Sequence, residues 1–226
     1  VAVPQYSAAG CTRKGHRSFV VVRMSATETN LLELRGSRAV INDVESMTGR
    51  HLLGDAVAAA GGGPSFFGRV DITGSHHASA LRVAAGEADV AAIDCVTFAN
   101  LEDEIPDVTR ALRVIAQTRD TPSLPFVMSN AYSEDIVEAV RRALDGALAD
   151  PDLASVRATL RLVGTAPALA SDYDRTLAIA ANADKVFDLR CVSLHSHEAL
   201  ANVDDGFDDR QKLATERGEL VFDGWR

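Results

Sequence analysis

The sequence contains no run of eighteen apolar residues, and no basic segment followed by an apolar one stands at its start. The first absence argues against a membrane-spanning helix, and the second leaves the chain without a recognisable signal peptide. Because the sequence begins at Val1 and not at a methionine, the missing leader says little about where the protein resides.

Cysteines are few. Cys11, Cys95 and Cys191 are the only three in 226 residues, and they stand far apart in the sequence. This spacing excludes a dense disulfide framework and any zinc pattern of paired cysteines. We therefore expect free or partly buried thiols, with no cofactor and no structural metal.

Basic residues are outnumbered by acidic ones. The chain has 23 Lys and Arg against 32 Asp and Glu, which gives a formal net charge of −9. A diffuse negative field repels nucleic acid and anionic membranes, so we expect no nucleic-acid partner. Any site for an anion must then be built locally. The hydrophobic content of 46% is sufficient for a core in one large domain or two small lobes.

What the sequence does contain is an alternation of short β-branched runs and amphipathic segments. SFVVVRM at 18–24 is typical of a buried strand, and MTGRHLLGDAVAAAG at 47–61 places its apolar residues on one helical stripe. The alternation predicts an α/β fold with a parallel-type sheet and helices on both faces. The polar tail after about Phe187 is predicted to be a docked extension or partly mobile. Strands are predicted at 18–24, 38–43, 69–73, 89–94, 112–118 and 126–129, and helices at 28–36, 47–61, 76–86, 96–101, 133–148 and 150–164.

Polar side chains follow three of the predicted strands. Ser46 and Thr48 follow the strand at 38–43, Ser75 and His76 follow the strand at 69–73, and Asp94 ends the strand at 89–94. Ligands of open parallel sheets bind beyond the carboxyl ends of the strands, where helix N-termini offer free N–H groups and partial positive charge. These residues therefore predict one site for an oxyanion.

Each of these side chains also has a plainer interpretation. Ser46 and Ser75 are good helix N-caps, and Asp94 is suited to cap the helix that follows it. A carboxylate beside an anion is costly unless it binds a cationic group of the ligand or a protonated phosphoryl oxygen. His76 is placed to donate a hydrogen bond to an oxyanion. A metal site at His76 would need a further His, Cys or Asp ligand three or four residues along the helix, and the sequence has none there. His77 is expected to be a surface residue or a supporting residue.

Three stretches together are similar to a known family. LRGSRAVINDVESMTG, TGSHHASALRVAAGEADVAAIDCVTF and LRVIAQTRDTPSLPFVMS resemble the phosphonate-, phosphate- and phosphite-binding proteins of ABC importers, and the likeness runs from about Val3 to Ala178. The resemblance implies a two-lobed type II periplasmic-binding-protein fold that closes by hinge motion. Residues 24–115 would form one lobe and residues 1–23 with 116–226 the other, joined by the strands SFVVVRM and LRVIAQT.

The resemblance also implies partners and a location. The ligand would be a phosphonate, phosphate or phosphite ion, the protein partner an ABC transporter permease, and the location periplasmic or membrane-associated outside the cytoplasm. Met47 would contact the ligand through its backbone. By motif, the implied ligand-binding residues are Ser46, Met47, Thr48, His76 and Asp94.

The chain departs from the family pattern in two places. Members often have a tyrosine just before the serine of the strand matching SFVVVR, whereas this chain reads GHRSF and places His16 and Arg17 there. The planar guanidinium group of Arg17 is predicted to donate several hydrogen bonds to the oxyanion. The opening βαβ unit of the family's first lobe has no counterpart before VAVPQY, so the N-terminal part is expected to be missing from this sequence.

Two other function classes compete with ligand binding. A hydrolase acting on a phosphoryl or acyl group would use His76 as general base and Asp94 as its orienting partner, but the sequence has no G-x-S-x-G motif and no activated nucleophile. An effector-sensing domain of a regulator would need a DNA-binding module, and none is visible. We therefore predict a binding protein and not an enzyme.

Overall fold

The computed structural model describes residues 1–187 and 192–193. Residues Val1–Leu194 form one compact unit. Cys191 and nearly all of the polar tail predicted after Phe187 lie outside the described residues. Among the residues that are described, no helix is both long enough and apolar enough to cross a membrane.

Six strands form the larger sheet, in the order β10-β5-β4-β6-β3-β7. Strands β10, β5, β4 and β6 pair in parallel, as the alternation of strands and helices predicts. Strand β3 runs antiparallel to both of its neighbours, so the sheet is mixed and not parallel throughout. The strands are β3 (Ser18–Arg23), β4 (Arg38–Ile41), β5 (Arg69–Ile72), β6 (Val90–Asp94), β7 (Leu112–Gln117) and β10 (Val192–Ser193).

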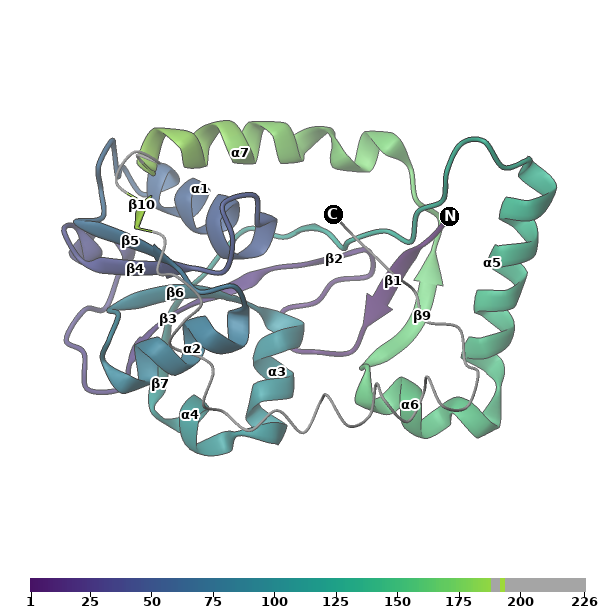
Figure 1. Ribbon diagram of the computed structural model, residues 1–226, viewed down its shortest axis with the longest axis horizontal. Helices are drawn as coiled ribbons and strands as arrows, with labels where there is room; N and C mark the ends of the chain where they lie inside the picture. The colour runs from purple at the N-terminus through teal and green to yellow at the C-terminus, as the bar shows by residue number, and fades with distance from the viewer. Residues whose placement is uncertain (188–191, 194–226) are drawn as a thin grey trace. The chain divides into compact units, whose positions relative to one another are not determined.

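Helices cover both faces of this sheet (Figure 1). Because successive side chains of a strand point to opposite faces, Val20 and Val22 of β3 pack on one side and Val21 packs on the other. The first face is covered by helices α1 (Leu52–Ala59) and α7 (Asp174–Val186). The second is covered by α2 (His76–Ala85), α3 (Cys95–Glu104) and α4 (Pro106–Arg110).

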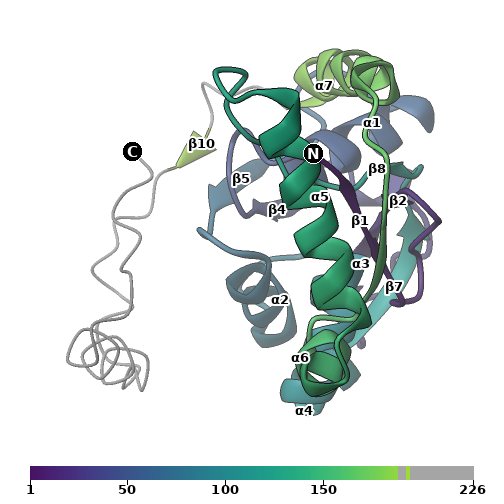
Figure 2. The same cartoon turned by 90° about the vertical axis from the view of Figure 1, so that its right-hand side faces the viewer.

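A smaller region contains a two-stranded antiparallel sheet of β1 (Val3–Tyr6) and β9 (Leu162–Ala166). Helix α5 (Glu134–Ala149) lies beside this sheet (Figure 2). Two further strands, β2 (Gly15–His16) and β8 (Thr121–Pro122), pair antiparallel. The remaining elements are η1 (Leu31–Leu34), η2 (Met47–His51), α5 (Glu134–Ala149), η3 (Pro151–Leu153), α6 (Ala154–Thr159) and η4 (Ala170–Tyr173).

Three predicted elements differ from those observed. The helix predicted at 150–164 ends at Thr159, because Arg161 has φ +53° and the following residues pair with β1 as strand β9. The strand predicted at 126–129 is only an isolated bridge between Ala2 and Phe126. The helix predicted at 28–36 is the short 3-10 helix η1, which Asn30 caps.

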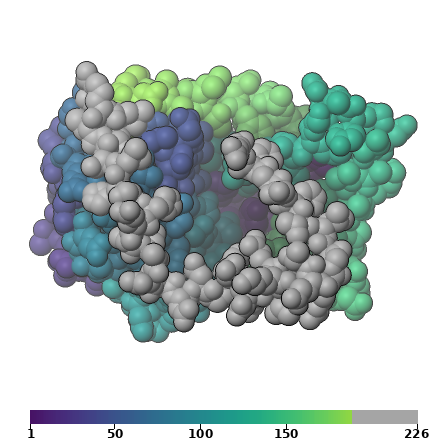
Figure 3. All heavy atoms as spheres, in the orientation of Figure 1, coloured from purple at the N-terminus to yellow at the C-terminus, as the bar shows by residue number. Residues whose placement is uncertain are grey.

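The predicted division into lobes at residues 24–115 stays a prediction. Strands β3 and β7, expected to join the lobes, both belong to the six-stranded sheet. Helix α7 lies within residues 116–226, which were predicted to belong to the other lobe, and it packs against α1 on that sheet. Figure 3 shows the atoms of α7 in yellow-green along the upper edge of the view.

Candidate functional site

A pocket of about 620 Å³ opens at the carboxyl ends of β4 and β6. The loop after β4, the first residue of α2, the end of β6 and the start of α3 supply one part of its lining. Strands β1 and β2 and the segment around β8 supply the rest. The lining residues are Tyr6, His16, Asn42, Asp43, Glu45, Ser46, Met47, Thr48, His76, Asp94, Val96, Thr97, Pro122 and Leu124.

The loop after β4 leads into a continuous helix made of η2 and α1. Ser46 caps this helix, and its Oγ accepts a hydrogen bond of 2.9 Å from the Gly49 N–H. A side chain at position 49 would clash, because a Cβ there would lie 1.7 Å from Asn42 Oδ1. The Ser18 hydroxyl donates to the Thr48 carbonyl at 2.8 Å and so fixes this turn to β3. The sequence therefore builds a rigid helix start at the pocket.

His76 is the first residue of α2, and it contacts the loop after β4. Its Nε2 lies 2.8 Å from Thr48 Oγ1. The helix begins here because Ser75 Oγ accepts a hydrogen bond of 3.0 Å from the Ala78 N–H. Burial lowers the pKa of His76, although the negative charge of Asp94 opposes this shift. The imidazole is therefore neutral near pH 7 and is able to donate one hydrogen bond and accept another.

Asp94 caps α3. Its Oδ1 accepts hydrogen bonds of 2.9 Å and 3.0 Å from the N–H groups of Val96 and Thr97. Its Oδ2 lies 3.5 Å from Nε2 of His16, whose Nδ1 is 3.3 Å from Ser123 Oγ. Burial lowers the pKa of His16 as well, while Asp94 acts in the opposite direction. The carboxylate thus faces the pocket beside a neutral imidazole.

The helix starts after β4 and after β6 differ in how their N–H groups are used. At α3, the Asp94 carboxylate already occupies the helix start. At the helix after β4, the N–H groups of Met47 and Thr48 make no hydrogen bond to any described residue. Such unpaired N–H groups carry partial positive charge, so this helix start attracts an anion although the net charge of the protein is negative.

The structure brings five of the predicted site residues together in this pocket: Ser46, Met47, Thr48, His76 and Asp94. Ser75 is absent from the lining, since its side chain caps α2 and is exposed. Arg17 is also absent, and its Nη1 donates to Gln117 Oε1 at 3.3 Å. His77 is exposed, as predicted.

His16 is a lining residue that the sequence analysis did not assign to the site. It and Ser18 are buried, whereas Arg17 between them is only partly buried. In an extended chain, alternate side chains point to opposite sides, so His16 faces the pocket and Arg17 points away. The sequence offers no local signal for this orientation, because strand β2 has only two residues and the apolar run that begins at Phe19 is buried on both faces.

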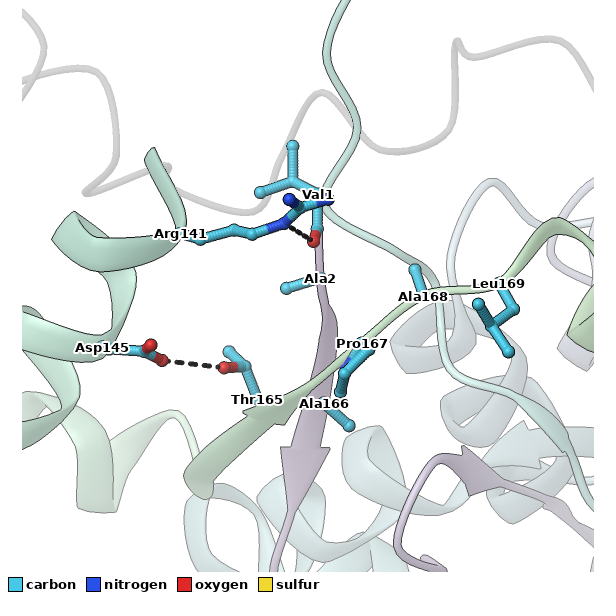
Figure 4. Close-up of a pocket in the computed structure, with 9 residues that line it drawn as sticks. All are labelled: Val1, Ala2, Arg141, Asp145, Thr165, Ala166, Pro167, Ala168 and Leu169. Carbon is cyan, nitrogen blue, oxygen red and sulfur yellow. Dashed lines mark hydrogen bonds between the residues drawn. The ribbon is translucent and has the colours of Figure 1, made fainter. Parts of the chain in front are cut away.

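A second pocket, of about 490 Å³, lies between α5 and the β1–β9 sheet (Figure 4). Its polar groups are already paired with each other. Arg141 Nε donates to the Val1 carbonyl at 3.0 Å, and Thr165 Oγ1 donates to Asp145 at 3.2 Å. The first pocket, with its unpaired N–H groups, is therefore the better candidate. In the described part of the chain, no group of three or more His, Cys, Asp or Glu side chains is placed to hold a metal ion.

Comparison with solved structures shows the same fold in binding proteins. A binding protein component of an ABC phosphonate transporter from Pseudomonas aeruginosa (PA3383) is 21% identical with a TM-score of 0.67, over 95% of this chain and 74% of that one. PhnD1 from Prochlorococcus marinus MIT 9301, solved with methylphosphonate, is 16% identical with a TM-score of 0.67, over 81% and 72% of the two chains. The alkanesulfonate-binding protein SsuA from Xanthomonas axonopodis pv. citri, bound to MOPS, is 16% identical with a TM-score of 0.56, over 86% and 73%.

These structures confirm the predicted α/β fold of type II periplasmic binding proteins. No curated protein matches the chain significantly. Residues 2–173 match the family described as ABC transporter, phosphonate, periplasmic substrate-binding protein. The chain therefore belongs to this family of substrate-binding proteins.

Proposed function

We propose that the pocket holds the oxyanion of a small phosphonate against the open start of the helix after β4, with Thr48 and His76 as side-chain partners. The observation that carries this proposal is the contact of 2.8 Å between Thr48 Oγ1 and His76 Nε2, beside the unpaired N–H groups of Met47 and Thr48. These groups together offer several donors to one anion without a nearby cationic side chain.

Asp94 favours a phosphonate over a sulfonate. A phosphonate monoanion retains one P–OH group, which is able to donate a hydrogen bond to Asp94 Oδ2. A sulfonate is fully ionised and offers only acceptors, so it would meet the carboxylate without a proton between them. A ligand with an ammonium group would also suit Asp94, because its positive charge would lie against the carboxylate.

The contacts of His76 and Asp94 do not favour the rival hydrolase. A general base needs an orienting partner, whereas Asp94 uses one oxygen for the start of α3 and lies with the other beside His16. His76 Nε2 faces the Thr48 hydroxyl. We infer that the protein binds its ligand without converting it.

Membership in the family carries further consequences for the whole protein. The family comprises periplasmic substrate-binding proteins of ABC transporters, which implies a location outside the cytoplasm and work with an ABC transporter. We also propose that the protein delivers its phosphonate to the permease of that transporter. The choice among phosphonate, phosphate and phosphite is left to the binding experiment.

A thermal-shift panel tests the proposed ligand class. The panel contains phosphate, phosphite, methylphosphonate, 2-aminoethylphosphonate and methanesulfonate. A ligand at one hundred times its dissociation constant stabilises the fold by about 2.7 kcal/mol, which corresponds to a rise in Tm of roughly 5 to 10 °C for a chain of this size. We expect such a rise with at least one phosphorus oxyanion and none with methanesulfonate.

Two variants control for binding elsewhere on the protein. His76→Ala should abolish the rise in Tm, and His77→Ala should preserve it, because His77 is exposed and does not line the pocket. A rise that survives His76→Ala would place the ligand elsewhere. Equal shifts with methanesulfonate and methylphosphonate would contradict the role given to Asp94.

A further inference from the structure

Two of the three cysteines lie side by side although 84 positions separate them in the sequence. The Sγ atoms of Cys11 and Cys95 are 3.5 Å apart. Cys95 is the first residue of α3 and is fully buried, while Cys11 is only partly buried. At this separation, small rotations of the side chains would bring the two sulfur atoms to a bonding distance of about 2 Å.

The backbone holds both cysteines in place. The Cys11 N–H donates to the Ala8 carbonyl at 3.1 Å, and the Cys95 N–H donates to the Arg17 carbonyl at 3.0 Å. Gly10 has φ +90°, and a Cβ at this position would lie 3.0 Å from the Cβ of Cys95. Glycine is therefore needed at position 10, both for its backbone conformation and for its close approach to Cys95. The turn before Cys11 is thus packed directly on the start of α3.

The thiol pair lies next to the proposed ligand pocket. Cys95 directly follows Asp94, and both Asp94 and Tyr6 line that pocket. Burial raises the pKa of Tyr6, and the charges of Asp94 and Cys11 raise it further, so the tyrosine is close to both groups. A bond between the two sulfurs would tie the connection between β1 and β2 to the helix that Asp94 caps.

We propose that Cys11 and Cys95 form an intramolecular disulfide in the mature protein. The family is periplasmic, and disulfides form and persist outside the cytoplasm. The hydrogen bond between the thiols lowers the pKa of Cys95 and raises that of Cys11, so the buried sulfur is the one that ionises first. Burial and the neighbouring Asp94 carboxylate oppose this lowering of the Cys95 pKa.

The oxidation requires a disulfide oxidant, such as oxidised glutathione or an oxidoreductase in its disulfide form. The Cys95 thiolate accepts the proton of the Cys11 thiol across their 3.5 Å contact, and the Cys11 sulfur, which is within reach of solvent, attacks one sulfur of the oxidant and releases the first thiolate. The released thiolate takes this proton from Cys95. The Cys95 thiolate then attacks Cys11 Sγ, the mixed disulfide breaks, and the second thiolate leaves. The two protein thiols lose two electrons, the oxidant's S–S bond is reduced to two thiols, and the protein's two protons pass to the leaving thiolates.

Thiol counting on the full-length protein tests this proposal without any ligand. The protein is incubated with oxidised glutathione, denatured in an alkylating reagent, and analysed by intact mass and peptide mapping. We expect one alkylated cysteine of the three, Cys191, and a cross-linked pair of peptides containing Cys11 and Cys95. The fully reduced protein should take up three labels.

The Cys191→Ser variant removes the remaining thiol and sharpens the count. This variant should take up two labels when reduced and none when oxidised, whereas Cys11→Ser should lose the cross-link and leave Cys95 free or bound to glutathione. Oxidation of Cys191→Ser should also raise Tm by roughly 5 to 15 °C, because the closed loop is long. Two free thiols after oxidation of Cys191→Ser, or a bond from Cys191 in the unmodified protein, would overturn the proposal.

Discussion

The six-stranded sheet and the β1–β9 sheet differ in how much of their apolar surface is covered. Val20, Val21 and Val22 in the middle of the larger sheet are completely buried between helices. On the smaller sheet, Val163 of β9 is 65% exposed. The two sheets therefore contribute unequally to stability, because apolar side chains stabilise a fold in proportion to the surface that they bury.

The helices show the same difference. Helix α1 buries Leu52, Leu53 and Val57, and α7 packs against it. Helix α5 is twice as long and has no buried residue. It is held by hydrogen bonds between Arg141 and Val1 and between Asp145 and Thr165. Arg141 also forms ion pairs with Glu134 and Glu138, and exposed pairs of this kind are worth little.

The proposed ligand pocket draws mainly on the better covered region. The donors at its helix starts belong to elements that pack on the six-stranded sheet, whereas Tyr6, Pro122 and Leu124 come from segments outside it. A rigid part therefore holds the polar groups, and a less covered part supplies much of the remaining wall. Five measurements test this difference between the regions, and the first has the largest expected effect.

The same substitution in each region tests where the stability lies. Leu53→Ala removes a fully buried side chain beneath α7, and Leu160→Ala removes one that is 53% exposed at the end of α6. We expect the first to lower the free energy of unfolding by about 2 to 5 kcal/mol and the second by less than about 0.5 kcal/mol. Urea denaturation measures both. Equal losses would show that the smaller region is as well packed as the larger one.

Removal of one hydroxyl in each region tests where the ligand binds. Thr48→Ala deletes the partner of His76, and Thr165→Ala deletes a hydroxyl that is bonded to Asp145 in the second pocket. Thr48→Ala should weaken methylphosphonate binding by about 1.5 to 3 kcal/mol, the range for hydrogen bonds to charged groups. Thr165→Ala should leave the affinity unchanged. Calorimetry that finds the larger loss in Thr165→Ala would move the ligand to the second pocket.

Asp94→Asn tests the charge at the pocket while keeping the cap. The amide oxygen still accepts from the start of α3, but the negative charge is lost. We expect 2-aminoethylphosphonate to bind about tenfold more weakly, which is about 1.4 kcal/mol, and methylphosphonate to change less. This effect is smaller than that of Thr48→Ala because α3 and His16 share the carboxylate. Equal losses for both ligands would place the contact of Asp94 at the phosphonate group, and no loss for either ligand would mean that Asp94 serves only as a helix cap.

Much of the fold could be predicted from periodicity alone. The strands at β3, β4, β5, β6 and β7 were predicted because each is a short apolar run between turn residues. Strand β9 could not be recognised in this way, since LRLVG continues a helical pattern and becomes a strand only through pairing with β1 at the other end of the chain. The antiparallel direction of β3 is likewise a property of tertiary pairing.

The residues at the helix starts of the pocket could be predicted from the sequence. The residues of the wall opposite these helix starts could not. Ser46, Thr48 and His76 directly follow strands, and position relative to a strand end is readable from sequence. The side to which His16 or Arg17 points depends on the register of a two-residue strand, β2, which has no periodicity of its own. The contact between Cys11 and Cys95 depends on the path of a loop, and no local pattern encodes it.

The two buried histidines of the pocket should make the stability of the protein depend on pH. The pKa values of His16 and His76 lie below the ordinary value of 6.5, chiefly because burial disfavours the charged form. The unfolded chain therefore takes up protons first, so stability is present above about pH 6.5 and is lost as the pH falls below it. Urea denaturation between about pH 7 and pH 5 should show this loss, and His76→Gln should reduce the slope. A slope that is unchanged in His76→Gln would assign the loss to other groups.

Leu124→Ala is expected to have the smallest effect, and it tests whether the less covered side of the pocket contributes to binding. Leu124 lines the pocket but is 74% exposed, so it has little buried surface to lose in the structure described here. If the ligand is held only by the helix starts on the opposite wall, methylphosphonate affinity should fall by less than about threefold, which is less than about 0.7 kcal/mol. Calorimetry of Leu124→Ala beside Leu169→Ala, an exposed leucine of the second pocket, gives the comparison. A loss above about tenfold in Leu124→Ala alone would mean that this wall closes over the ligand and buries the side chain. In that case the poorly covered region would be stabilised by the ligand itself, and the two regions would differ less when the ligand is bound.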